Sequence, residues 1–183
     1  LEPDMIDRKL ADAVSHKTVV PHFHIPVQSG SNIILSKIKR HYTSDKVFEA
    51  VKLLRSSKQD PFIAADLIVG LPGERMEDFE DSYDLIKSLN LSQLHIFPYS
   101  PRPGTALFNA ADHVPERITG ERIERIRNLA SNLNLDYLQR WQGREVEVIL
   151  EKYIHNKDKK SYWSGISQNY LNVRLTGLEG DND

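Results

Sequence analysis

Apolar and polar side chains alternate along residues 22–27, and a turn of small polar residues follows at 28–31. A period of two is typical of a β-strand whose two faces differ. One face carries apolar side chains and the other mostly polar ones: Phe23, Ile25 and Val27 against His22, His24, Pro26 and Gln28. Because parallel α/β folds place their chemistry where strands end in turns, we expect a site at this turn.

Two further strands are predicted at residues 62–70 and 93–99, and segments with helical periodicity separate the strands. Residues 62–70 form the most apolar run in the chain, which is typical of a strand buried on both faces of a parallel sheet. Helices are predicted near residues 3–14 and 33–39, from residue 43 or 44 onward, and after residue 74. This repeated alternation indicates βαβ units with right-handed crossovers.

The pattern changes after Pro115. A long helix is predicted from Ile118 or Thr119 to residue 142, with Gly143 as its stop signal. The period then returns to two, which predicts a small antiparallel β domain. We therefore expect three parts: residues 1–142, a β domain at 143–178, and a disordered tail at 179–183.

The composition restricts the possible chemistry. The 183 residues carry a net charge of −2, so any binding of nucleic acid must depend on local basic patches. There is no cysteine, which excludes disulfides and thiolate ligands from this chain. No apolar run approaches the roughly 20 residues that span a bilayer, and no signal-peptide pattern is present. The chain begins at Leu1 without a methionine, so we expect that it was cut from a longer protein.

The alternation rule places several polar side chains on one concave side of the predicted sheet: His24, Gln28, Asp66, His95 and Tyr99. A buried carboxylate is costly unless it is hydrogen-bonded, so this convergence favours a ligand site over an ordinary core. The loop at residues 100–105 is made rigid by two prolines and a glycine, which also favours a functional role.

Three features of the sequence each allow two interpretations. His22 and His24 have the spacing of metal ligands, but no third ligand is identifiable, so structural histidines or neighbours of a cofactor are favoured and no metal site is predicted. Glu74 is either a cap on the following helix or a functional carboxylate. The basic and aromatic residues 38–42 form either a solvated helix end or an anion-binding element.

Four sequence motifs, in this order and spacing, resemble the radical-SAM methylthiotransferase family: HFHIPVQSGS, IKRHYT, ADLIVGLPGE and LHIFPYSPRPGT. The closing GREVEVILEKY and SQNYLNVRL resemble that family's TRAM domain, a small RNA-binding β-barrel. The amino-acid sequence of residues 95–100, HIFPYS, is most similar to the subgroup that methylthiolates threonylcarbamoyladenosine in tRNA. The isopentenyladenosine subgroup comes second, and the subgroup that modifies a ribosomal protein comes third.

The resemblance implies an α/β fold: half of a TIM-like partial (β/α)6 barrel with parallel strands, then a long helix and a TRAM-like domain. The family's radical-SAM cluster requires a CxxxCxxC motif, which this chain lacks. The [4Fe-4S] clusters are therefore expected in the parent protein only. The chain alone is expected to be inactive and to contain no catalytic residue. A cytoplasmic location is also implied.

The resemblance further implies a partial S-adenosylmethionine site. Gln28 and Ser29 would contact polar groups of the cofactor, Arg40 its carboxylate and Asp66 its ribose hydroxyls. The backbone from Gly70 to Gly73 would lie beside the adenine. Three loop residues would face the cofactor or the target base: Tyr99, Ser100 and Arg102. The TRAM-like domain would hold the tRNA anticodon region through basic and aromatic side chains, chiefly Lys157, Lys159, Lys160, Tyr170 and Arg174.

Two other functions remain open on the sequence alone. The chain could act by itself as an RNA-binding module, or Asp66 and Glu74 could form the acid–base pair of a hydrolase. Half of a parallel barrel also leaves one strand edge and the inner face uncovered. We therefore expect this surface to be covered by a dimer, a domain swap or the long helix.

Overall fold

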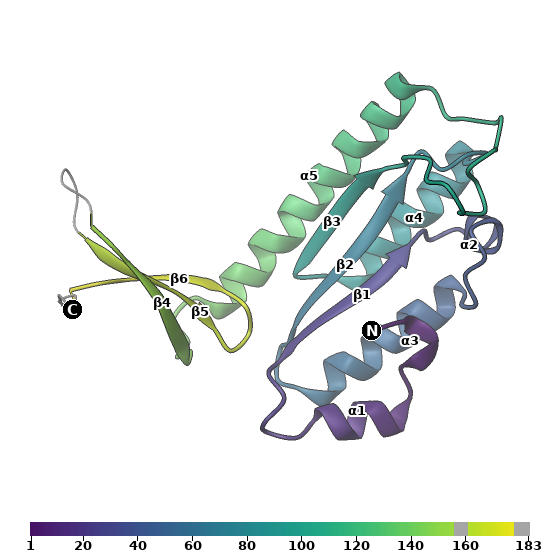
Figure 1. Ribbon diagram of the computed structural model, residues 1–183. Helices are drawn as coiled ribbons and strands as arrows, with labels where there is room; N and C mark the ends of the chain where they lie inside the picture. The colour runs from purple at the N-terminus through teal and green to yellow at the C-terminus, as the bar shows by residue number, and fades with distance from the viewer. Residues whose placement is uncertain (156–160, 178–183) are drawn as a thin grey trace.

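The computed structural model describes residues 1–155 and 161–177, which form a parallel sheet backed by helices and a second, antiparallel sheet (Figure 1). The parallel sheet has the order β1-β2-β3. Its strands are β1 (His22–Gln28), β2 (Phe62–Val69) and β3 (Gln93–Pro98). The three predicted strands and their parallel pairing are thus confirmed.

The helices begin where the sequence offers capping side chains. Asp7, Ser31 and Thr43 each accept a hydrogen bond from a backbone amide three residues later. The helical elements are η1 (Pro3–Met5), α1 (Arg8–Val14), α2 (Asn32–Lys37), α3 (Ser44–Ser57), α4 (Met76–Leu89) and α5 (Glu116–Trp141). No helix in the described ranges is both long and apolar enough to cross a membrane.

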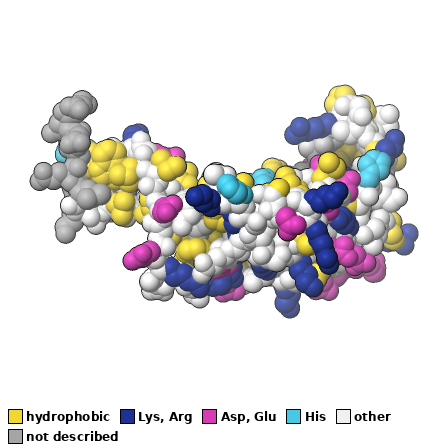
Figure 2. Space-filling view, turned by 90° about the horizontal axis from the view of Figure 1, so that it is seen from below, with side chains coloured by type: hydrophobic (Ala, Val, Ile, Leu, Met, Phe, Trp, Pro, Cys, Tyr) yellow, Lys and Arg dark blue, Asp and Glu magenta, His cyan; other side chains and the backbone are white. Residues whose placement is uncertain are grey.

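Helices cover one face of the parallel sheet and leave the other open. The covered face buries Ile25, Leu67 and their apolar neighbours against α3, α4 and α5. The long helix α5 joins this same core through Ile126 and Leu133, and its Tyr137 reaches the other face only at the start of β2. Figure 2 shows the molecule hollowed between its two ends, with histidine side chains along the hollow.

The expectation that residues 62–70 are buried on both faces is wrong for the second half of β2. Phe62 and Ala64 are buried in a second cluster with Tyr137, but Asp66 and Ile68 remain partly exposed. The reason is that the cluster around Tyr137 covers only the start of this face, so alternate residues near the carboxyl end of β2 remain partly exposed.

The antiparallel sheet at the C-terminal end has the order β4-β5-β6. Its strands are β4 (Val148–Ile154), β5 (Tyr162–Ser167) and β6 (Asn172–Thr176). The β5–β6 turn lies against the start of the parallel sheet, where the Tyr170 and His22 rings stack at 3.9 Å. The Asn169 amide is fully buried and donates to the Tyr137 hydroxyl of α5. The predicted tail, residues 179–183, lies outside the described residues.

Gly30 allows the turn after β1 to approach α4. A Cβ added at this position would lie 2.5 Å from the backbone of both Asp81 and Ser82. We expect Gly30→Ala to lower the free energy of unfolding by about 1–3 kcal/mol, because backbone atoms must shift to admit the methyl group. Urea denaturation measures this change.

Gly120→Ala is the matched control. Gly120 lies in α5 with no atom within 4 Å of an added Cβ, and alanine stabilises a helix by about 0.5–1 kcal/mol relative to glycine. Equal effects of the two substitutions would refute the importance of the close approach at Gly30.

Candidate functional site

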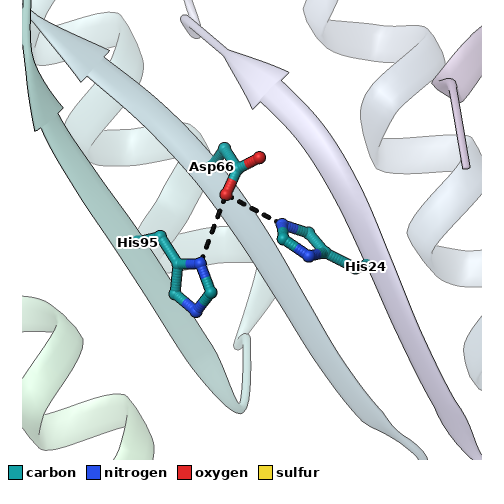
Figure 3. Close-up of side chains that lie close together, drawn as sticks. All are labelled: His24, Asp66 and His95. Atoms are coloured by element: carbon teal, nitrogen blue, oxygen red, sulfur yellow. Dashed lines mark hydrogen bonds and ion pairs between the residues drawn. The ribbon is translucent and has the colours of Figure 1, made fainter.

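Three polar side chains from three different strands meet on the open face of the parallel sheet (Figure 3). His24 Nε2 lies 2.8 Å from Asp66 Oδ1, and His95 Nδ1 lies 3.4 Å from the same oxygen. Asp66 and His95 are register partners in the β2–β3 pair, and the two histidine rings are roughly perpendicular at 5.2 Å. The prediction that the strands send these side chains to one face is confirmed.

A cavity of about 620 Å³ lies at the carboxyl end of the same face. It is lined by six of the residues that the resemblance placed at a cofactor or substrate: Gln28, Arg40, Asp66, Tyr99, Ser100 and Arg102. Apolar side chains complete the wall, among them Leu71 and Phe97. The cavity therefore combines cations, one carboxylate and apolar surface.

Two of the polar lining groups are held in place by the fold. The Arg40 guanidinium is 3.2 Å from the Glu2 carboxylate, and the Tyr99 hydroxyl donates to the Leu107 carbonyl at 2.8 Å. Gln28 ends β1 at a register shift with a positive φ of 65°, a conformation that is uncommon for residues other than glycine. This kink sets the direction in which the chain leaves the sheet.

Ser29 lies apart from the cavity-lining residues. Its side chain is buried, its hydroxyl lies 3.3 Å from that of Ser82, and it accepts a hydrogen bond from the Ser31 amide. The Ser31 hydroxyl in turn donates to the Asp78 carboxylate at 2.6 Å. The polar turn therefore attaches β1 to α4, and the predicted contact between Ser29 and a cofactor stays a prediction.

The backbone amides of the two predicted adenine-binding glycines already have partners. Gly70 donates to the Glu74 carboxylate at 3.2 Å, and Gly73 donates to the Asp112 carbonyl at 2.7 Å. Both glycines have positive φ angles, 82° and 72°. They shape the turn after β2, and a role beside an adenine stays a prediction.

Glu74 forms a buried ion pair, a role that neither interpretation of the sequence, helix cap or functional carboxylate, included. It is buried and pairs with the equally buried Arg122 of α5, whose guanidinium also donates to the Glu74 carbonyl. Burial raises the pKa of the Glu74 carboxyl, while Arg122 and the Gly70 amide act in the opposite direction. The cap of α4 is formed instead by Arg75 and Asp78.

Asp66 and Glu74 do not form the acid–base pair of a hydrolase. Asp66 is engaged by histidines on the open face and lines one cavity. Glu74 is engaged by Arg122 and lines a different cavity. The two carboxylates share neither a partner nor a site, and this interpretation is therefore wrong.

The predicted RNA-binding residues are dispersed. Tyr170 packs on His22 and Phe62 at the junction of the two sheets, where burial lowers the pKa of His22. The exposed Arg174 lies over the Tyr162 ring at 5.1 Å. Lys157, Lys159 and Lys160 lie outside the described residues. Contact between these residues and RNA stays a prediction.

Comparison with known proteins first relates the chain to a broad class. Residues 2–86 match the model of the Radical SAM superfamily. Among solved structures, a radical SAM coproporphyrinogen III oxidase from Escherichia coli superposes with a TM-score of 0.62 at 14% identity, over 98% of this chain and 50% of the oxidase. Elp3 from Methanocaldococcus infernus gives a TM-score of 0.59 at 14% identity, over 100% of this chain and 57% of Elp3. These two likenesses concern the fold alone.

The sequence relatives are more specific. The chain is 40% identical over 164 residues to threonylcarbamoyladenosine tRNA methylthiotransferase MtaB of Treponema pallidum. It is 34% identical over 161 residues to MtaB of Bacillus subtilis. These alignments cover 90% and 88% of this chain but only 34% and 36% of the relatives, so the chain spans about a third of their length. The resemblance to radical-SAM methylthiotransferases is thereby confirmed.

The buried Arg122–Glu74 pair is expected to support the turn after β2. Replacing Arg122 with methionine leaves the Glu74 carboxylate buried without its cation, which typically costs about 3–5 kcal/mol. Chemical denaturation of Arg122→Met measures the loss. Arg117→Met is the control, because Arg117 and Glu121 form an exposed pair within one helix that contributes at most about 0.5 kcal/mol. A loss at Arg122 no larger than at Arg117 would contradict the assigned role.

Proposed function

We propose that this chain is the C-terminal half of the barrel and the TRAM-like domain of a tRNA methylthiotransferase. The parent enzyme would add a methylthio group to C2 of threonylcarbamoyladenosine next to the anticodon. The observation that carries the proposal is the 40% identity to MtaB of Treponema pallidum over 164 residues. The location would be the cytoplasm, where the tRNA substrate is available.

The cavity residues fit S-adenosylmethionine in chemical type. Arg40 can pair with its carboxylate, the Asp66 oxygen directed away from the histidines can accept from its ribose hydroxyls, and Leu71 and Phe97 offer apolar surface to its adenine. When bound and cleaved, this cofactor supplies the radical that removes hydrogen from the target carbon. The residues of this chain bind and orient it, while Tyr99, Ser100 and Arg102 face the same cavity.

The chain does not fit an iron–sulfur cluster. It has no cysteine, and the clusters of this class are held by cysteine thiolates. We therefore assign the clusters to another part of the parent protein and expect the chain alone to be inactive.

Nucleoside analysis tests the substrate. The gene that encodes this chain would be expressed in Bacillus subtilis lacking its own MtaB, and the hydrolysed tRNA analysed by mass spectrometry. We expect 2-methylthio-threonylcarbamoyladenosine to reappear with the complete gene and to remain absent when residues 1–183 alone are expressed. The same experiment with the complete gene carrying Asp66→Asn should show reduced product.

Two other results are informative. Appearance of 2-methylthio-isopentenyladenosine would favour the second subgroup. Absence of either product from the complete gene, at normal protein levels, would refute the proposed activity.

The β4–β6 sheet is the proposed tRNA contact, and a stand-alone RNA-binding module is the alternative function that shares this surface. We expect Arg174→Ala to weaken tRNA binding by the chain. The plot of log affinity against log salt concentration should also become less steep by about one, because one phosphate contact is lost. Filter binding or fluorescence anisotropy at several salt concentrations measures both quantities.

The matched control removes an exposed cation elsewhere. Lys9→Ala lies on α1, which is separate from the antiparallel sheet (Figure 1), and should leave affinity and slope unchanged. Equal effects at both positions would indicate nonspecific attraction and would count against a dedicated surface.

A further inference from the structure

We propose that His24, Asp66 and His95 form a binding site for a divalent transition-metal ion of the zinc type. Each residue offers one ligand atom, and the three atoms all lie within 4.8 Å of one another. They come from three neighbouring strands, so the backbone hydrogen bonds of the sheet fix their relative positions. This inference uses only residues of the chain and is independent of the proposed methylthiotransferase activity.

The donor set selects the class of metal. Two imidazole nitrogens and one carboxylate oxygen suit Zn²⁺, Co²⁺, Ni²⁺ and Fe²⁺, whereas Mg²⁺ and Ca²⁺ prefer oxygen ligands alone. Tetrahedral zinc with bonds of about 2.0–2.1 Å places its ligand atoms roughly 3.4 Å apart. The observed contacts to Asp66 Oδ1, 2.8 Å from His24 and 3.4 Å from His95, are close to that spacing. The third spacing, between the two histidine nitrogens, is at most 4.8 Å, so binding an ion requires the two rings to adjust around it.

A simple hydrogen-bonded network accounts less well for the arrangement. Both histidines are directed at the same oxygen of Asp66, while Figure 3 shows its second oxygen directed away from them. The His24 contact has hydrogen-bond geometry, but the 3.4 Å contact from His95 meets only the looser ion-pair distance. A cation between the three groups would satisfy both imidazole nitrogens at once.

The site would keep open coordination positions. The side chains of His24, Asp66 and His95 are 43%, 25% and 38% exposed, and the helices lie on the opposite face of the sheet. Three protein ligands with an accessible further position are typical of zinc sites that bind water or an exchangeable ligand. Because Asp66 also lines the 620 Å³ cavity, such a ligand would lie at the cavity's edge.

Isothermal titration of the tag-free chain with ZnCl₂ tests the proposal, and CoCl₂ serves as a spectroscopic probe. We expect one equivalent of zinc to bind, and bound cobalt to give the visible absorption of a four- or five-coordinate ion. His95→Gln and Asp66→Asn should each weaken zinc binding at least about tenfold. Even the loss of a residue that only hydrogen-bonds to a metal ligand typically lowers metal affinity about 10–100-fold. An anomalous difference map from zinc-soaked crystals would place the ion directly.

Controls separate this site from adventitious binding. His16→Ala removes an exposed histidine whose ring nitrogen contacts only the nearby Thr18 among described residues, and it should leave zinc affinity unchanged. Circular dichroism and thermal melting test whether each variant is folded. If His95→Gln does not fold, Asp66→Asn still tests the site, because it preserves the volume of the side chain. Absence of zinc binding, or equal binding by the wild type and both site variants, would overturn the proposal.

Discussion

A strand side chain can point to only one of two faces, and this constraint determines where the polar groups carried by the strands lie. The apolar set of each strand is drawn to the helical layer because burial of its hydrocarbon surface is favourable. The intervening residues must then occupy the opposite face. His24, Asp66 and His95 consequently stand together without any local signal that attracts them to one another. Their convergence is a result of packing elsewhere in the sheet.

The turns at the strand ends depend on a second set of interactions, which are buried and polar. The turn after β1 is attached to α4 through hydroxyl and carboxylate groups, and the turn after β2 is attached to α5 through Glu74 and Arg122. Such contacts are directional, so they fix the angle at which each loop leaves the sheet. The loops at the cavity are thereby supported from the helical side while their other side remains accessible.

The sequence predicts features that depend on neighbouring residues, and it does not predict features that depend on contacts between residues far apart in the chain. Periods of two and of three to four predicted the strands, the helices and the shared face of His24 and His95, because these are local properties. The inward direction of Ser29 and the pairing of Glu74 with Arg122, 48 positions away, depend on tertiary contacts that no spacing rule encodes. The same is true of the stacking of Tyr170 on His22, because a β-turn residue carries no signal of the surface it will meet.

The open face gives Asp66 two different environments. One oxygen is directed at two imidazoles and the other is directed away from them, so the carboxylate can serve a cation and a ligand hydroxyl together. A cation at the first oxygen would fix the orientation of the carboxylate and so direct the second oxygen toward a ligand. Loss of one histidine would remove one of the two side-chain contacts to this oxygen. Asp66 therefore connects the two histidines to the cavity, which neither of them lines.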